Sequence, residues 1–182
     1  ITPDRAVFFT DFRYQEQSAD QVGKAARIVV FKKSLVDSLK KEIKKFKIAR
    51  LGIEKSMSLN LFLSYAENLK IDLIPTELLV EELRQYKDSD ELACLKKAFS
   101  IADAAFADLM EIIKPGMSET EVAAHLEFYM KLHGSEMPSF DTIIASGPNA
   151  SKPHAQPSSR RIKVGEMVKI DFGAVSGGYH SD

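Results

Sequence analysis

Hydrophobic and polar positions follow two different patterns along the chain. Through about the first 80 residues, short apolar runs alternate with stretches in which apolar residues recur at helical spacing. The clearest helical stretch begins at Ser34, a predicted N-cap, and carries Leu35, Leu39, Ile43 and Phe46 on one face. This alternation predicts an α/β layer with a mostly parallel or mixed sheet. Strands are expected at residues 6–10, 27–31, 48–53 and 70–74, with Pro75 ending the last.

Two long helices are predicted next. Pro115 separates them, and Ser118 with Glu121 forms a capping box that predicts the start of the second, which ends at Gly134. The first, at about 90–113, is expected to bury a stripe of residues at helical spacing. That stripe consists of Leu92, Leu95, Phe99, Ala102, Phe106, Leu109 and Ile113.

The change of pattern predicts a domain boundary. A polar stretch precedes the long helices, so we expect one domain at residues 1–84 and a second at 85–182. The second domain continues with a strand at 142–145, a polar loop and a hairpin that closes the chain.

Composition excludes several classes of function. The chain has 182 residues and a formal net charge of −1, so neither a nucleic-acid nor an anionic-membrane partner is favoured. No apolar run approaches the roughly 20 residues of a membrane span. A single cysteine, Cys94, cannot form an internal disulfide and fits a reducing compartment. We therefore expect a cytoplasmic enzyme or binding protein.

Two aspartates frame the final hairpin. Residues 167–172 predict a strand, and a turn centred on Ser176 and Gly177 would place Asp171 directly opposite Asp182. Opposed carboxylates repel each other, so this register predicts a divalent metal site. The alternative is that Asp171 starts a turn and Asp182 is a solvated chain end. Two aspartates do not complete a coordination sphere, so further His and Glu ligands are expected elsewhere.

Two histidines are candidates for chemistry. His154 lies in a loop rich in Gly, Pro and Ser, where it could hydrogen-bond a substrate carbonyl, although a loop histidine is often merely solvated. His180 shares the face of Asp182 and is expected to have an outer-shell or substrate-side role.

These motifs together resemble the pita-bread metallopeptidases. The stretch from Phe140 through Ile143-Ile-Ala-Ser-Gly-Pro to His154, followed by Asp171 and by Gly-Tyr-x-Ser-Asp182, carries the resemblance. The Thr10-Asp-x-Arg-Tyr stretch looks like the proline-specific branch, which contains Xaa-Pro aminopeptidases and prolidases. The resemblance implies an N-terminal α/β domain of the creatinase/prolidase type, incomplete at its start, and the first half of a pita-bread catalytic domain.

The resemblance also implies roles for individual residues. Asp171 would chelate one of two divalent metals (manganese, cobalt or zinc), and Asp182 would bridge both. His154 would assist substrate binding and the tetrahedral intermediate. The remaining His and two Glu ligands would lie beyond Asp182, so this segment alone is expected to be inactive. Substrates would be proline-containing peptides, and a homodimer is compatible with the family.

Two other functions remain open. The chain could be a relative of creatine amidinohydrolases, which use this architecture without metal, or a non-catalytic pita-bread adaptor. The presence of Asp171, Asp182 and His154 favours the metallopeptidase.

Overall fold

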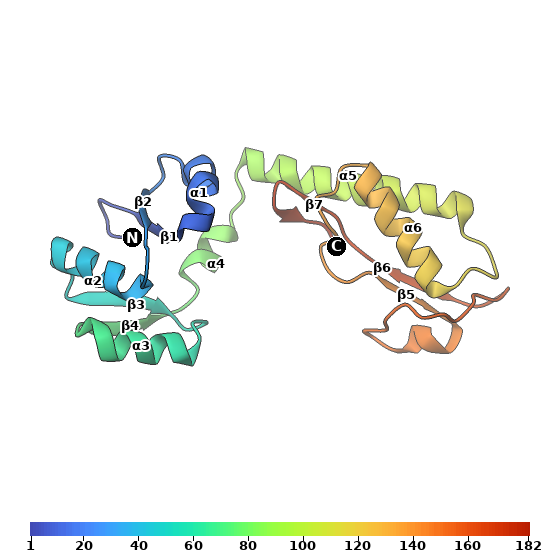
Figure 1. Cartoon of the computed structure of the whole chain (residues 1–182). Helices are drawn as coiled ribbons and strands as arrows, with labels where there is room; N and C mark the ends of the chain where they lie inside the picture. The colour runs from blue at the N-terminus through green and yellow to red at the C-terminus, as the bar shows by residue number, and fades with distance from the viewer. The chain divides into compact units, whose positions relative to one another are not determined.

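The computed structural model describes every residue from Ile1 to Asp182, and the chain forms two compact units (Figure 1). The first contains Ile1–Leu83 and the second Arg84–Asp182. None of the helices combines the length and the apolar character needed to cross a membrane.

The first unit is built from strand–helix–strand repeats. Strands β1 and β2 pair in parallel, as do β3 and β4, so the predicted α/β alternation is confirmed. The elements in chain order are β1 (Val7–Thr10), η1 (Phe12–Tyr14), α1 (Gln15–Val22), β2 (Arg27–Val30), α2 (Leu35–Phe46), β3 (Arg50–Glu54), α3 (Leu59–Leu69), β4 (Asp72–Thr76) and α4 (Leu79–Arg84).

Local chemistry explains the start of α2 and the extent of β4. The Ser34 side chain accepts a hydrogen bond from the Asp37 N–H, which confirms the predicted cap of α2. The prediction that Pro75 ends its strand is wrong, because β4 continues to Thr76. The backbone N–H of Asp72 donates to the Ala49 carbonyl, and the backbone carbonyl of Thr76 accepts from the Lys55 N–H. The alternating backbone therefore directs the nitrogen of Pro75 away from β3, where no N–H is needed.

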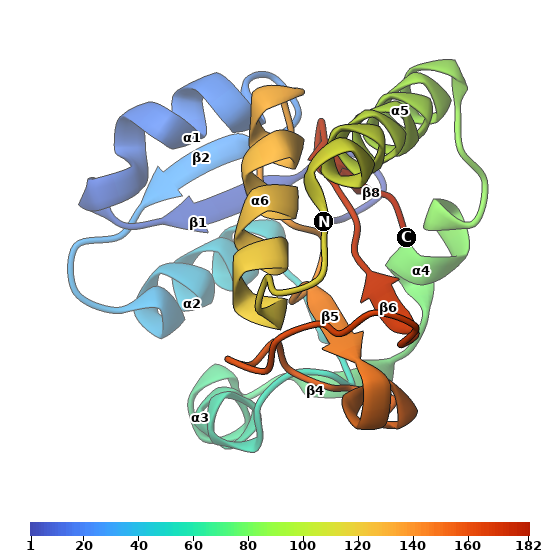
Figure 2. The same ribbon diagram turned by 90° about the vertical axis from the view of Figure 1, so that its right-hand side faces the viewer.

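The second unit places two helices over short antiparallel strands. Helices α5 (Ser89–Ile112) and α6 (Glu119–Leu132) pack on each other and are followed by β5 (Ile143–Ser146), η2 (Gly147–Ser151) and β6 (Val168–Asp171). Strand β6 runs antiparallel beside β5 (Figure 2), and β7 (Val175–Ser176) pairs with β8 (Tyr179–His180). The capping box predicted at Ser118 and Glu121 is confirmed at the start of α6.

The buried face of α5 matches the predicted stripe only in part, at Ala102 and Leu109. The residues that the helix buries are Ala98, Ile101, Ala102, Ala105 and Leu109. Leu92, Phe99 and Phe106 are instead 45%, 47% and 38% exposed. Ala102 and Ala105 share one buried cluster with Ile101 and Leu109 and with residues of α6, so small and large side chains of α5 pack together there.

Candidate metal centre

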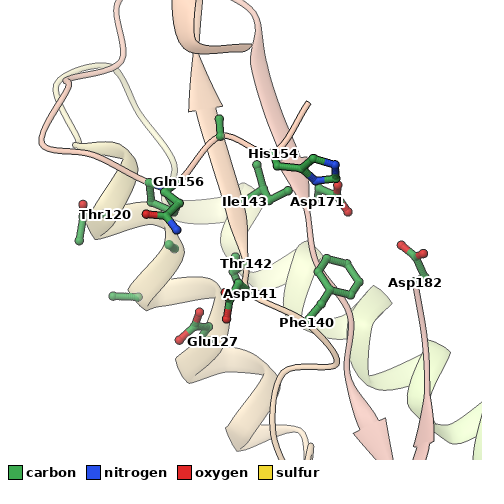
Figure 3. Close-up of a pocket in the computed structure, with 14 residues that line it drawn as sticks. Thr120, Glu127, Phe140, Asp141, Thr142, Ile143, His154, Gln156, Asp171 and Asp182 are labelled. Atoms are coloured by element: carbon green, nitrogen blue, oxygen red, sulfur yellow. The ribbon is translucent and has the colours of Figure 1, made fainter. Parts of the chain in front are cut away.

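A cleft in the second unit contains three of the four residues that the sequence predicts for the site. It has a volume of about 820 Å³, and His154, Asp171 and Asp182 all line it. In Figure 3 these side chains and Phe140 gather at one end, whereas Thr120 and Glu127 lie at the other, on α6.

Asp171 is fixed by its position at the end of β6. The residue is half-buried, and its register partner is Ile143 of β5. Lys169, two residues earlier, shares its face of the strand because side chains alternate. The Lys169 ammonium donates to the backbone carbonyls of Lys152 and, at 2.9 Å, of Pro153. This contact ties the segment that leads into His154 to the strand that carries Asp171.

The hairpin before Asp182 has a different register from the predicted one. Val175 pairs with His180 and Ser176 with Tyr179, so Gly177 and Gly178 form the turn. Both glycines have positive φ, 59° and 76°, as the favoured two-residue hairpin turn requires. The predicted turn at Ser176 and Gly177 is therefore wrong.

The corrected register places Gly173, not Asp171, opposite Asp182. The Ser181 N–H donates to the Ala174 carbonyl at 2.9 Å, which continues the pairing by one residue. Moving the turn by one position shifts the register by two residues, which is the side-chain period of a strand. Asp171 and Asp182 thus become diagonal neighbours, and their side chains still line the same cleft.

The end of the chain is held by several short contacts. The Ser139 hydroxyl donates to the Ser181 carbonyl at 2.8 Å, and the Ser181 hydroxyl accepts from the Ala174 N–H at 2.9 Å. Gly173 lies so close that an added Cβ would be 2.0 Å from the Ser181 carbonyl oxygen. These contacts fix the backbone immediately before Asp182.

A second anchor connects the hairpin to the start of α5. The Tyr179 hydroxyl donates to Glu91 at 2.5 Å, and Glu91 also caps α5 through the Asp88 N–H. The hydrogen bond to Glu91 raises the pKa of Tyr179 to about 12. The same bond lowers the pKa of Glu91.

His154 lies in an exposed position on the loop that follows η2. The segment that contains this loop, residues 146–158, is held at both ends by Glu119, the first residue of α6, whose side chain is fully buried. Burial alone would raise the pKa of Glu119, but hydrogen bonds from Ser158, Ser146 and Asn149 outweigh it and lower the pKa to about 2.

The other histidines lie outside the cleft. His180 is exposed and does not line it, so its substrate-side role stays a prediction. His133 is the C-cap of α6, and its Nε2 lies 2.8 Å from an Asp108 carboxylate oxygen.

The two aspartates fit part of a metal's coordination sphere. Both present carboxylate oxygens, the donors that hard divalent ions prefer. The ion pairs of the chain involve other carboxylates, so neither aspartate is neutralised by a Lys, Arg or His. No group of three or more His, Cys, Asp or Glu residues is placed to hold a metal. The aspartates are therefore suited to ligation but need further ligands.

Sequence reasoning missed the residues that support the site. Glu119 reads only as an acidic residue in a helix's first turn, and Lys169 as one position of an alternating strand. Thr142 was also missed; it lines the cleft, and its buried hydroxyl has no hydrogen-bond partner. No local pattern identifies these three residues, because their environment is created by the fold.

Both units match known families. Residues 1–86 match the creatinase/prolidase N-terminal domain, and residues 93–182 match metallopeptidase family M24. The uncharacterized peptidase YqhT of Bacillus subtilis is 42% identical over 100% of this chain, which covers 52% of that protein.

Solved structures agree with these matches. An Xaa-Pro dipeptidase from Bacillus anthracis superimposes with a TM-score of 0.94 at 40% identity, over 100% of this chain and 51% of that one. An X-Pro aminopeptidase from Thermotoga maritima superimposes with a TM-score of 0.90 at 32% identity. The match covers 100% of this chain and 52% of that one. The chain thus spans about half the length of the relatives it matches.

Proposed function

The chain belongs to metallopeptidase family M24, with the pita-bread fold, and from this we propose that the intact protein hydrolyses the peptide bond before proline. Similar structures include both an Xaa-Pro dipeptidase and an X-Pro aminopeptidase. The proposed substrate is therefore defined by its Xaa-Pro bond, and both dipeptides and longer peptides are candidates. The observation that carries it is the presence of His154, Asp171 and Asp182 in one cleft.

Each of these residues has a part in the proposed reaction. Asp171 and Asp182 would hold divalent metal, with manganese, cobalt or zinc as the candidates. When bound, such a metal lowers the pKa of bound water and polarises a carbonyl. His154 is within the same cleft and would donate a hydrogen bond to the substrate carbonyl oxygen as it gains negative charge.

The cleft also offers a surface for the substrate. Phe140, Ile143 and Ala155 give apolar contacts near His154, which suits the ring of a proline residue. Because Asp171 and Asp182 alone leave coordination positions unfilled, we further propose that the 182 residues are inactive without the rest of the protein.

Substitution of Asp182 in the intact protein tests this function. Asp182→Asn removes an anionic oxygen, so we expect bound metal to fall and hydrolysis of an alanyl-proline substrate to drop by at least about 100-fold. Asp103→Asn makes the same chemical change on an exposed position of α5 and is expected to leave both quantities unchanged. Unaltered metal content and activity in Asp182→Asn would contradict the proposal.

A further inference from the structure

Glu119 is a buried carboxylate whose two oxygens are both fully engaged. Oε1 accepts from the Ser146 N–H at 2.7 Å and from the Ser146 hydroxyl at 2.9 Å. Oε2 accepts from the Ser158 N–H at 3.1 Å and from the Ser158 hydroxyl at 2.6 Å. The Asn149 amide lies 3.2 Å from both oxygens. Every partner of this side chain belongs to one segment of the chain, residues 146–158.

The chemistry of these contacts requires a carboxylate. Each oxygen receives a backbone N–H, which can only donate, so neither oxygen can be exchanged for an amide nitrogen without leaving an N–H unpaired. Glu119 is also the first residue of α6, where the helix dipole favours a negative charge. A single ionised side chain thereby binds both ends of the segment.

His154 lies between these two anchored ends. Ser146 and Asn149 precede it by eight and five residues, and Ser158 follows it by four. Closer to His154, the Lys169 ammonium holds the carbonyls of Lys152 and Pro153. The loop is therefore attached to α6 at its ends and to the Asp171 strand near its middle, although the His154 ring itself is exposed.

We propose that Glu119 is a positioning residue, which fixes the His154 loop so that the imidazole is held beside Asp171 and Asp182 in the cleft. This inference rests on the proposed function of His154 in hydrolysis. Glu119 does not line the cleft, so it acts on the reaction only through the loop. Precise placement matters because a displacement of about 1 Å can lower a rate on the order of 100-fold.

Three variants of the intact protein separate positioning from general stability. Glu119→Gln leaves one backbone N–H facing an amide nitrogen. Ser158→Ala removes a single hydroxyl donor and is the milder change, which keeps the test available if Glu119→Gln does not fold. Glu111→Gln is the matched control, because Glu111 is an exposed glutamate on α5 with no side-chain partner.

The decisive measurement is a double-mutant cycle with His154→Ala. Because His154 acts on the transition state, Glu119→Gln is expected to lower kcat at least about tenfold with a change in KM below about threefold. Ser158→Ala is expected to lower kcat by about two- to fivefold. In the His154→Ala background, Glu119→Gln should lower kcat by less than about twofold, since the imidazole that Glu119 positions is already absent.

The NMR signals of the His154 ring give a second readout that needs no activity. They should shift in Glu119→Gln and in Ser158→Ala, but not in Glu111→Gln. Equal losses of kcat with and without His154, or unmoved ring signals, would overturn the inference. If the wild-type protein hydrolyses no Xaa-Pro peptide, the proposed function fails, and the ring signals alone then decide whether Glu119 positions His154.

Discussion

Acid should weaken the protein through Glu119 in a defined pH range. The pKa of this carboxyl is lowered from 4.5 to about 2 in the folded protein, because hydrogen bonds from Ser158, Ser146 and Asn149 outweigh the effect of burial. On acidification, the Glu119 carboxylate therefore binds a proton more readily in the unfolded chain than in the folded one. The stabilisation is fully present above pH 4.5 and is lost as the pH falls from 4.5 towards 2.

The size of the effect follows from the shift in pKa. One pKa unit corresponds to about 1.4 kcal/mol, so a change from 4.5 to about 2 is worth roughly 3 kcal/mol of folding free energy at neutral pH. The Glu119→Gln variant lacks this proton-linked contribution. Its stability should therefore lie well below that of the wild type at pH 7, and the difference should shrink steadily between about pH 4.5 and pH 2.

Thermal unfolding of the intact protein across this pH range measures the difference. The wild type and Glu119→Gln are compared at each pH, with Glu111→Gln as the control for loss of an exposed carboxylate. Glu91, Glu121 and Glu166 also have lowered pKa values, but they are present in both proteins and cancel in the comparison. Curves that remain parallel from pH 5 to pH 2 would refute the assignment of this linkage to Glu119.

Three further results are expected. Gly173→Ala would place a Cβ 2.0 Å from the Ser181 carbonyl oxygen, so we expect a loss on the order of 2 kcal/mol in thermal unfolding together with reduced metal content. Gly52→Ala, whose nearest contact would be 3.1 Å, is the milder control, and equal losses in the two variants would contradict the steric argument. Tyr179→Phe should remove from the ultraviolet titration curve a component near pH 12, because the bond to Glu91 raises the pKa of Tyr179 to about 12, and loss of a component near pH 10 instead would exclude that bond. Chelation of divalent metal should abolish hydrolysis reversibly, whereas full activity in excess chelator would contradict metal dependence.

The features that were predictable from the sequence are those set by neighbouring residues. The Ser118 and Glu121 capping box, the Ser34 cap and the alternation of strands with helices depend on contacts within a few positions, and all are present. The predicted α5 stripe is confirmed only at Ala102 and Leu109, because 3.6-residue spacing identifies a helix but does not reveal which side a partner helix covers. That choice depends on the fit between α5 and its neighbours, in which α5 buries three alanines together with Ile101 and Leu109.

The supporting residues of the site could not be predicted for a related reason. Glu119 obtains its partners 27 and 39 residues further along the chain, and Lys169 reaches back 16 and 17 residues. Neither residue stands out from its neighbours, since a glutamate in a helix's first turn and a lysine on a strand are both common on surfaces. Only the folded loop converts them into anchors.

The aspartate pair shows why a wrong register can still place two side chains correctly. The sequence favours a turn at Ser176 and Gly177, but two adjacent glycines with positive φ adopt the hairpin turn at lower cost, which moves the centre by one residue. Moving the centre of the turn by one residue shifts the pairing of the two strands by two residues, so the Asp182 side chain stays on the same face. Asp182 therefore lies diagonally to Asp171 and not directly opposite it. A change in the number of turn residues by one would instead change the pairing by one, and it would direct the Asp182 side chain to the opposite face. The proximity of the two carboxylates therefore depends on the two-residue length of the turn more than on which residues occupy it.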